Sequence, residues 1–197
     1  AVFTEGAYPR GLYYVNKGKI KVTQIGADGK EQIVHLVKDT DVMGYRAILS
    51  GDRYSCSAIL MEDSLLYFIP KDIFFSLLEK NPKFALQVFH LFSKKLKEAE
   101  KKITSIAQQP VKERIAQSLI LLTESYGFEK DGATLAIVIT REEIANISGS
   151  SRETVIRALT EFQKDKIIAL SGKKIKILQP AALRKAANIS TDQGYLF

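Results

Sequence analysis

In the first 70 residues, apolar and polar positions alternate in short runs, which is the pattern of β-strands. The runs GLYYVNKGKIKVTQI and EQIVHLV flank GADGKE, in which Asp28-Gly29 is a strong signal for a tight hairpin turn. Another turn is predicted at residues 16–18, and SCSAILMEDSLLYFIP adds two short strands around residues 62–63. Short strands joined by tight turns predict a small antiparallel barrel or jelly roll.

From residue 71 the apolar positions take the period of a helix. KDIFFSLLEKNP predicts a short helix that stops at Asn81-Pro82, and KFALQVFHLFSKKLKEAEKKITSIAQQ then continues without Gly or Pro. Along this long helix, apolar residues alternate in steps of four and three, which is a heptad seam. This dimer seam consists of Ala85, Phe89, Phe92, Leu96, Ala99, Ile103 and Ile106. Such a helix can lie on its own domain, but the heptad period favours a parallel dimer.

After the long helix, Pro110 marks a hinge. VKERIAQSLILLTESYG predicts an amphipathic helix that is closed by Gly127. EKDGATLAIVI then predicts a loop and a short strand, and KKIKILQPAALRKAA predicts a strand and a last helix.

The segment TREEIANISGSSRETVIRALTEF carries two signals for the start of a helix. Thr140 and Glu143 have the spacing of a capping box, and so do Ser150 and Glu153. Between the two predicted helices, Gly149 is free to adopt a left-handed conformation, so the helices are expected to cross at a steep angle. This arrangement is a helix-turn-helix.

The second helix of this motif has two different faces. Its predicted buried face is formed by Val155, Leu159 and Phe162. Its exposed face consists of Ser151, Arg152, Glu153, Ile156, Arg157 and Thr160. Arginine can donate two hydrogen bonds to guanine, glutamate can accept one from cytosine, and an isoleucine can touch a thymine methyl, while hydroxyls near a helix start can hold phosphate. The alternative is an ordinary surface helix, but the paired caps favour a helix that reads the major groove of DNA.

A wing is predicted directly after this helix. QKDKIIALSGKKIKIL predicts a β-hairpin that turns at residues 171–173, whose lysines can lie along a phosphate backbone. The predicted fold class is therefore α+β: an antiparallel β-roll or jelly roll, a long dimerisation helix and a winged helix-turn-helix. The corresponding domains are predicted at residues 1–81, 82–109 and 110–197.

Charge and composition agree with a DNA-binding protein. The formal net charge is +7, and residues 152–185 contain nine Lys or Arg against three acidic residues, a net charge of +6. A basic patch is either a solvated face or a site for a polyanion. No apolar run approaches the roughly 18 residues of a membrane span, and the first residues lack a signal-peptide pattern, so no membrane partner is expected. With Cys56 as the single cysteine, no internal disulfide can form, and the cytoplasm is the expected compartment.

With these motifs in place, the chain resembles the catabolite-activator/fumarate-nitrate-regulator (CRP/FNR) family of bacterial transcription factors. The resemblance covers nearly the whole chain, through GLYYVNKGKIKV, GKEQIVHL, ERIAQSLILL and the highly specific SRETVIRAL. It implies a homodimer in which Arg152, Glu153 and Arg157 read a palindrome of TGTGA-like half-sites, with RNA polymerase as a further partner. The implied contacts to the DNA backbone are Thr140, Arg141, Ser150, Ser151, Thr154 and Lys173.

The effector site departs from the pattern of this family. Members that bind cyclic nucleotides carry Gly-Glu-Leu, whose Glu holds the ribose, and then Arg-Ser or Arg-Thr, whose Arg holds the phosphate. Here Tyr45 follows Gly44 in place of the Glu, and Tyr54 precedes Ser55 in place of the Arg. Neither tyrosine supplies the missing charge, and loss of a bidentate phosphate clamp removes binding. Cyclic AMP is therefore not the expected effector, no cofactor is evident, and an unidentified small-molecule effector is left open.

Two further observations concern the same degenerate effector pocket. On the long helix, Ala99 and Glu100 replace hydroxyl residues that contact adenine in nucleotide-binding members, and the Glu100 carboxylate would repel a phosphate. Arg46 or Arg53 can supply a phosphate ligand if the loop rearranges. A cyclic-nucleotide-responsive regulator with a rearranged pocket is therefore the first alternative function.

Metal-dependent functions are not expected. Iron–sulfur sensors need about four thiolate ligands, whereas Cys56 is alone in this chain. A cupin-like enzyme in the barrel, the second alternative, would need a cluster of ligands, but His35 and His90 each stand without a ligand at useful spacing. We therefore expect neither a metal site nor enzyme activity. The resemblance also implies a further stretch before the segment that matches AVFTEGAYP, so the first domain is expected to lack its N-terminal start here, and a cysteine-rich sensor segment in that stretch is left open.

Overall fold

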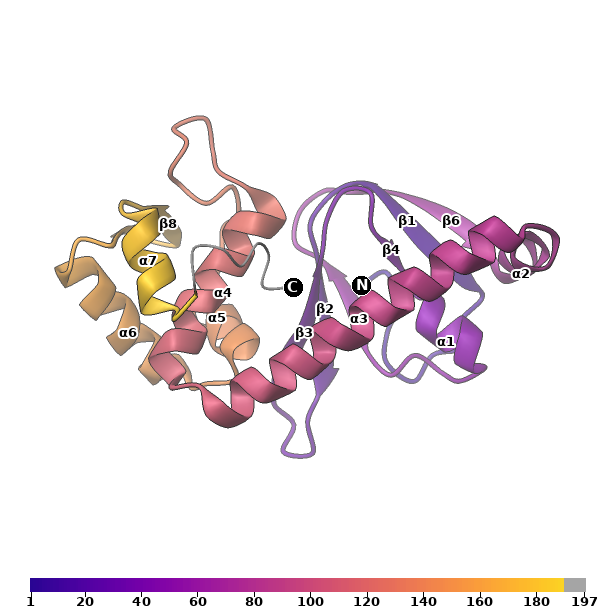
Figure 1. Ribbon diagram of the computed structural model, residues 1–197, viewed down its shortest axis with the longest axis horizontal. Coiled ribbons are helices and arrows are strands. Elements are labelled where there is room, and N and C mark those ends of the chain that lie inside the picture. The colour runs from indigo at the N-terminus through magenta and orange to yellow at the C-terminus, as the bar shows by residue number, and fades with distance from the viewer. Residues whose placement is uncertain (190–197) are drawn as a thin grey trace. The chain divides into compact units, whose positions relative to one another are not determined.

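The computed structural model describes residues 1–189 of the chain. Its internal contacts divide the chain into two compact units, Ala1–Lys97 and Glu98–Phe197. Figure 1 labels most of the helices and strands of both. The boundary between the units falls inside the long helix. The predicted domain limits stay predictions, and residues 190–197 of the last predicted domain lie outside the described residues.

The first unit contains two antiparallel three-stranded sheets. One sheet has the order β4-β1-β6, with β4 at Val42–Met43, β1 at Gly11–Lys17 and β6 at Leu65–Pro70. The other has the order β3-β2-β5, with β3 at Glu31–Val37, β2 at Ile20–Ile25 and β5 at Ser57–Leu60. The three predicted turns join β1 to β2, β2 to β3 and β5 to β6, so the predicted β-roll is confirmed.

The core of this unit follows from the alternation of its strands. Val15, Ile20 and Ala58 are fully buried and belong to one apolar cluster. At the hairpin between β2 and β3, Gly29 has a φ of 76°, a left-handed conformation that glycine adopts without strain. The exposed side of the hairpin carries the polar residues of GADGKE. The inward apolar positions therefore fix which face of each strand is buried.

A short helix, α1 at Tyr45–Ser50, interrupts the strands between β4 and β5. The sequence pattern did not predict it, because six residues are too few to show a helical period. Gly44 and Gly51 bound it, and both have left-handed backbone conformations. Its Ile48 packs with Leu12 of β1 in a second, smaller core. This helix carries two of the residues expected around an effector, Tyr45 and Arg46.

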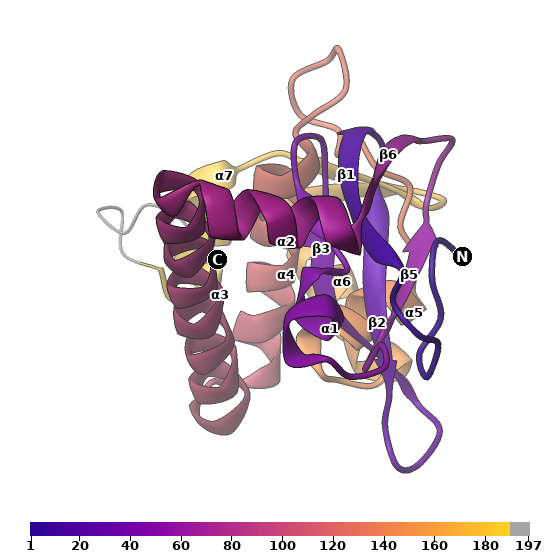
Figure 2. The same cartoon turned by 90° about the vertical axis from the view of Figure 1, so that its right-hand side faces the viewer.

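Two helices follow the sheets, α2 at Lys71–Lys80 and α3 at Pro82–Gln108. Asn81 separates them in an extended conformation, and its side-chain oxygen accepts a hydrogen bond from the amide of Phe84 at 3.1 Å. The predicted helix stop at Asn81-Pro82 is thereby confirmed. Phe74 of α2 and the partly buried Phe84 share the smaller core with α1, and these helices are seen together in Figure 2.

The second unit contains the remaining helices and a two-stranded hairpin. They are α4 at Val111–Tyr126, α5 at Arg141–Ser148, α6 at Arg152–Lys164, β7 at Ile168–Ser171, β8 at Lys174–Ile177 and α7 at Pro180–Ala186. Leu119 of α4, Ile144 of α5 and Phe162 of α6 are fully buried, and these three helices pack against one another. The predicted winged helix-turn-helix is confirmed, and Gly127 closes α4 as predicted. The segment predicted as a short strand before α5 forms only isolated bridges.

Candidate nucleic-acid interface

The first helix of the motif begins with the predicted capping box. The hydroxyl of Thr140 accepts a hydrogen bond from the amide of Glu143 at 3.1 Å, and the Glu143 carboxylate accepts one from the amide of Thr140 at 2.9 Å. These bonds satisfy amides that a helix start leaves free. Gly149 ends α5 after eight helical residues, with a φ of 62°. The turn between the helices is therefore the tight, glycine-dependent turn that the sequence predicts.

The second predicted capping box is wrong. Ser151, and not Ser150, caps α6, because its hydroxyl accepts a hydrogen bond from the amide of Thr154 at 3.2 Å. Ser150 still belongs to the end of α5, since its amide donates to the carbonyl of Ala145 and its hydroxyl lies 2.8 Å from that of Ser148. The chain thus needs one more residue than predicted to leave the first helix and begin the second.

The two faces of α6 separate as predicted. Val155, Leu159 and Phe162 are buried, and Ala158 joins them. The exposed side chains of the described helix include Arg152, Glu153, Ile156, Arg157 and Thr160. They repeat in steps of one and then three or four residues, and therefore form one stripe. We call this stripe the reading face.

The side chains at the start of the reading face have free hydrogen-bonding groups. Among the described residues, neither Arg152 nor Glu153 has a hydrogen bond or ion pair, and Arg157 donates only to the hydroxyl of Thr154, at 3.3 Å. Ile156 is 43% exposed, which is high for an isoleucine in a folded domain. Exposed groups without a partner in the protein are those that a duplex can engage. Their assignment to individual bases stays a prediction.

The wing is a hairpin whose lysines differ in their partners. Ser171 pairs with Lys174, so the loop consists of Gly172 and Lys173. Lys174 forms an ion pair with Glu129 at 2.8 Å, and Lys176 forms one with Asp131 at 3.2 Å. Within the described chain, exposed Lys173 has no such partner. Lys173 is therefore the wing lysine with a free charge for a phosphate.

Asp131 fixes the loop that supports the wing. Its carboxylate accepts hydrogen bonds from the amide and hydroxyl of Thr134 and from the amide of Ala133. The amide of Thr134 contributes most to holding the pKa of Asp131 well below its usual range. Leu135 then donates from its amide to the carbonyl of Ile175 at 2.9 Å, which joins this loop to β8. The loop thereby adds a third short segment to the wing.

At its other end, α6 is held against α4. Lys112 forms an ion pair with Glu161 at 2.5 Å and lies over the ring of Phe162. The hydrogen bond from Lys112 lowers the pKa of the Glu161 carboxyl. The contact is exposed, so it contributes little to stability. It nevertheless pairs the negative charge of Glu161 with a positive charge of the protein itself.

Arg114 is a residue that sequence reasoning missed. Its guanidinium donates to the carbonyls of Ser148 and Gly149 at 3.0 and 3.1 Å, in the turn of the motif. It also donates to the carbonyls of Gln109 and Ile106, at 2.8 and 3.5 Å, at the end of α3. In the sequence Arg114 is one polar residue of an amphipathic helix, and no local pattern indicates these partners.

The predicted dimer seam is exposed along much of α3. No residue of this helix is buried, and Phe89, Leu96 and Ile103 are 67%, 63% and 68% exposed. Ala99 and Ile106 are also exposed. Phe92 differs, because its ring lies 5.3 Å from that of Tyr45 in the first unit. The pairing of this seam with a second copy stays a prediction.

Tyr54 occupies the interior of the first unit. It is 6% exposed, its hydroxyl donates to the carbonyl of Gly11 at 3.2 Å, and its ring stacks on Phe3 at 4.0 Å. Burial raises the pKa of Tyr54 to about 12, so it is neutral near pH 7. At the position where the family resemblance implies a phosphate-binding arginine, the chain thus has an uncharged side chain that already packs on Phe3 and donates a hydrogen bond to Gly11.

Of the other residues predicted for the effector pocket, Gly44 lies beside Tyr54, since a Cβ on it would be 3.4 Å from the Tyr54 hydroxyl. Arg46 is exposed and its guanidinium lies 3.5 Å from the sulfur of Cys56, while Ser55 is exposed. Arg53 donates to the carbonyl of Gly6 and to the hydroxyl of Tyr8. Ala99 and Glu100 are exposed and belong to the second unit.

His35 has a partner that was not predicted. The amine of Lys95 on α3 lies 3.2 Å from Nε2 of His35 on β3, within the first unit. His90 is exposed on α3. Among residues 1–189, no group of three or more His, Cys, Asp or Glu could hold a metal ion. The helices of that same stretch include none both long and apolar enough to cross a membrane.

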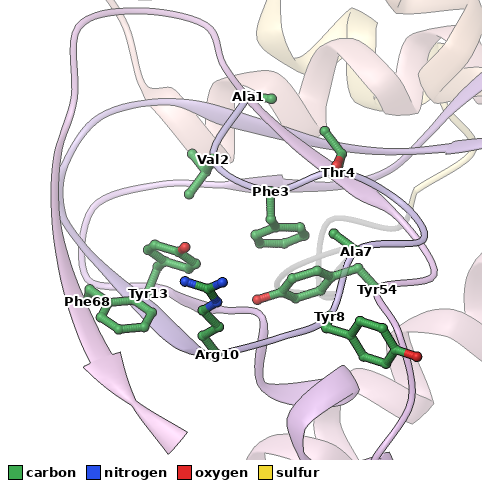
Figure 3. Close-up of a pocket in the computed structure, with 10 residues that line it drawn as sticks. All are labelled: Ala1, Val2, Phe3, Thr4, Ala7, Tyr8, Arg10, Tyr13, Tyr54 and Phe68. Atoms are coloured by element: carbon green, nitrogen blue, oxygen red, sulfur yellow. The ribbon is translucent and has the colours of Figure 1, made fainter.

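A cavity of about 320 Å³ lies beside Tyr54, between the first ten residues and the β1 sheet. Figure 3 shows Arg10 lying between Tyr13 and Tyr54 in this cavity. Of the residues predicted for the effector pocket, Tyr54 alone lines it. Tyr54 is therefore the residue that this cavity shares with the predicted effector pocket, and the assignment of the other residues to one pocket stays a prediction.

Comparisons with known proteins match both parts of the chain. The family model of the cyclic nucleotide-binding domain matches residues 1–81, and that of the Crp-like helix-turn-helix domain matches residues 113–186. The fumarate and nitrate reduction regulatory protein of Vibrio cholerae is 32% identical over 194 residues, which are 97% of this chain and 76% of the relative. The CRP-like cAMP-activated global transcriptional regulator of Mycobacterium tuberculosis is 27% identical over 187 residues, 94% of this chain and 84% of the relative.

The fold is also that of a solved structure. A CRP-family transcriptional regulator from Thermus thermophilus superposes with a TM-score of 0.81, over 98% of this chain and 95% of that chain, at 20% identity. This likeness concerns the fold.

Proposed function

The chain belongs to the CRP/FNR family of DNA-binding transcription regulators, and we propose that it acts as a homodimer that reads a palindromic, TGTGA-like operator without cyclic AMP. This family consists of regulators and not of enzymes. The observation that carries the proposal is the reading face of α6, where Arg152 and Glu153 are exposed and have no partner among the described residues. A cytoplasmic regulator of this kind would also contact RNA polymerase.

The reading face has the chemistry that the TGTGA sequence needs. An arginine at the start of a recognition helix can donate two parallel hydrogen bonds to O6 and N7 of a guanine. The adjacent carboxylate of Glu153 can accept a hydrogen bond from cytosine on the opposite strand. Arg157 lies one turn further along the same stripe and reaches a neighbouring base pair. Lys173 of the wing and hydroxyls such as that of Ser151 supply contacts to phosphate.

A homodimer follows from the dimer seam of α3. The large apolar side chains of Phe89, Leu96 and Ile103 are each more than 60% exposed in the single chain. Exposed apolar residues in a heptad repeat are buried when two such helices pair. A two-fold dimer presents two copies of α6, and it therefore reads two half-sites about one helical turn apart.

Independence from cyclic AMP is supported by the residues at the expected phosphate site. Tyr54 is buried, neutral and bonded to Gly11, and Arg46 contacts Cys56. A cyclic phosphate would need a cation there to replace its lost hydration. The second candidate function, a cyclic-nucleotide-responsive regulator, is favoured by the match of residues 1–81 to the cyclic nucleotide-binding domain. In that case Arg46 or Arg53 would have to leave its present partner.

Fluorescence anisotropy with a labelled TGTGA palindrome tests this function. We expect tight binding by the protein alone, about 1,000-fold tighter than binding to a scrambled duplex at the same salt concentration. Addition of cyclic AMP or cyclic GMP should leave both the affinity and the thermal unfolding midpoint unchanged. Binding that required either nucleotide would favour the second function, and equal affinity for the palindrome and the scrambled duplex would contradict sequence-specific recognition.

A further inference from the structure

Arg114 joins two helix ends with one side chain. Its guanidinium contacts two carbonyls at the end of α3, those of Ile106 and Gln109, and two in the turn after α5, those of Ser148 and Gly149. Carbonyls at the end of a helix lack partners within the helix and carry a partial negative charge. A guanidinium with five donors in a fixed plane can satisfy such groups from two helices at once.

From this geometry we infer that Arg114 is a positioning residue for DNA recognition, which links the last turn of α3 to the turn that presents the reading face. The inference rests on the proposed function of α6. Gly149 lies two residues before the Ser151 cap, and Arg152 and Glu153 follow the cap directly. A shift of the Gly149 carbonyl therefore moves the start of α6, where the predicted base contacts lie.

A second set of contacts also joins the end of α3 to α4 and supports this role. The hydroxyl of Ser105 on α3 lies within hydrogen-bond distance of the side-chain oxygens of Gln109 and of buried Gln117 on α4. Gln117 in turn donates to the carbonyl of Ala187 at 3.0 Å. The end of α3 is therefore bonded to α4 through two side chains, those of Arg114 and Gln117. Pro110 is not a free hinge in this arrangement. The helix before it and the helix after it are bonded to each other, because Arg114 of α4 contacts the carbonyls of Ile106 and Gln109 and Gln117 of α4 contacts Ser105.

The position requires the shape of arginine and not only its charge. An Arg114→Lys substitution keeps one positive charge, but a single ammonium with three donors cannot span the carbonyls of both helix ends. An Arg114→Gln substitution removes the charge as well. Arg184→Gln provides a matched control, because it removes one arginine charge from α7 of the same unit, where Arg184 contacts Glu124 at 3.6 Å.

Hydrogen exchange of the DNA-free protein tests the link itself. We expect Arg114→Gln to raise amide exchange by about tenfold in two separate peptides, one that covers residues 105–110 and one that covers residues 147–152, with α7 unchanged. Arg114→Lys should restore protection at no more than one of these places, and Arg184→Gln should change neither. Faster exchange at only one helix end in Arg114→Gln, or full protection in Arg114→Lys, would overturn the inference.

Binding to the TGTGA palindrome tests the consequence for recognition. Both Arg114 variants should lose about tenfold in affinity for the palindrome, and less for a scrambled duplex, while their thermal unfolding remains cooperative. Arg184→Gln should reduce both affinities to the same small extent, as the loss of a remote charge does. Wild-type affinity in Arg114→Lys would contradict a positioning role. If the wild-type protein itself did not prefer the palindrome, the proposed function would fail. The hydrogen-exchange result would still decide whether Arg114 links the end of α3 to the turn after α5.

Discussion

At the scale of single residues, Arg152 and Glu153 are exposed at a helix start that Ser151 caps. The cap fixes the backbone from which both side chains project. A guanidinium can form two parallel hydrogen bonds with guanine, whereas the ammonium of a lysine contributes mainly charge. In the proposed function the two cations therefore have different roles: Arg152 discriminates between sequences, and Lys173 of the wing adds affinity for any duplex.

Substitution of Arg152 by Ala should weaken binding to the TGTGA palindrome by about 1–3 kcal/mol per half-site and relax the preference at one guanine. Substitution of Lys173 by Ala is the matched control, because it should weaken binding to all sequences alike and lower the salt dependence by about one phosphate contact per half-site. Anisotropy titrations with duplexes changed at single positions measure both effects. A uniform loss in the Arg152 variant would make Arg152 a phosphate contact.

Sequence reasoning at this scale worked where partners are close in the chain. Thr140 and Glu143 are three residues apart, and their capping box could be predicted. Ser150 and Ser151 are chemically the same, and only the folded turn decides which of them caps α6. Arg114 could not be predicted, because two of its partner carbonyls lie 34 and 35 residues away.

At the scale of elements, a helix or strand can be predicted from the sequence only where it is long enough to show its hydrophobic period. The five longer strands of the first unit and the long helix α3 extend over enough residues for a period to be visible, and they were predicted, whereas the two-residue strand β4 was not. The six residues of α1 are too few, and two left-handed glycines define its ends. The arrangement of Tyr54, Arg46 and Cys56 likewise depends on which strand or helix face turns inward, which the sequence does not specify for a short loop.

The dimer seam of α3 can be tested by charge. Glutamates in place of Leu96 and Ile103 would place four buried carboxylates at the centre of a paired seam, so we expect a monomer that binds the palindrome poorly. Glutamates in place of the exposed Lys94 and Lys101, outside the predicted seam, form the control and should leave the dimer intact. Light scattering gives the mass. An unchanged mass for the seam variant would show that these residues do not hold a dimer together.

The wing provides a prediction of pH dependence. Because hydrogen bonds lower the folded pKa of Asp131, its charged form stabilises the loop above the ordinary value of 3.8, and this contribution is lost as pH falls from there toward the lowered pKa. Asp131→Asn should therefore lower the thermal midpoint near pH 6, with a difference from wild type that shrinks near pH 3. Asp63→Asn, at an exposed site, is the control. A constant difference at both pH values would contradict a role for the Asp131 charge.

At the scale of the whole molecule, the two units differ in how far their residues agree with those that the family resemblance implies. The second unit carries the residues that the family resemblance associates with DNA, and three of them, Arg152, Glu153 and Arg157, lie on one exposed stripe. The first unit matches the cyclic nucleotide-binding domain, and Tyr45 and Tyr54 stand at the positions where the family resemblance implies a charged pair. The effector could not be predicted, since a fold alone does not define a ligand.

The central claim is that two copies of the reading face engage two half-sites on one side of a duplex. The most direct measurement compares the wild-type affinity for the TGTGA palindrome with that for the same palindrome lengthened at its centre by about five base pairs, half a helical turn. The insertion turns one half-site to the opposite side of the duplex. We predict a loss of affinity of about 100-fold or more. Equal affinity for the two duplexes would contradict the account.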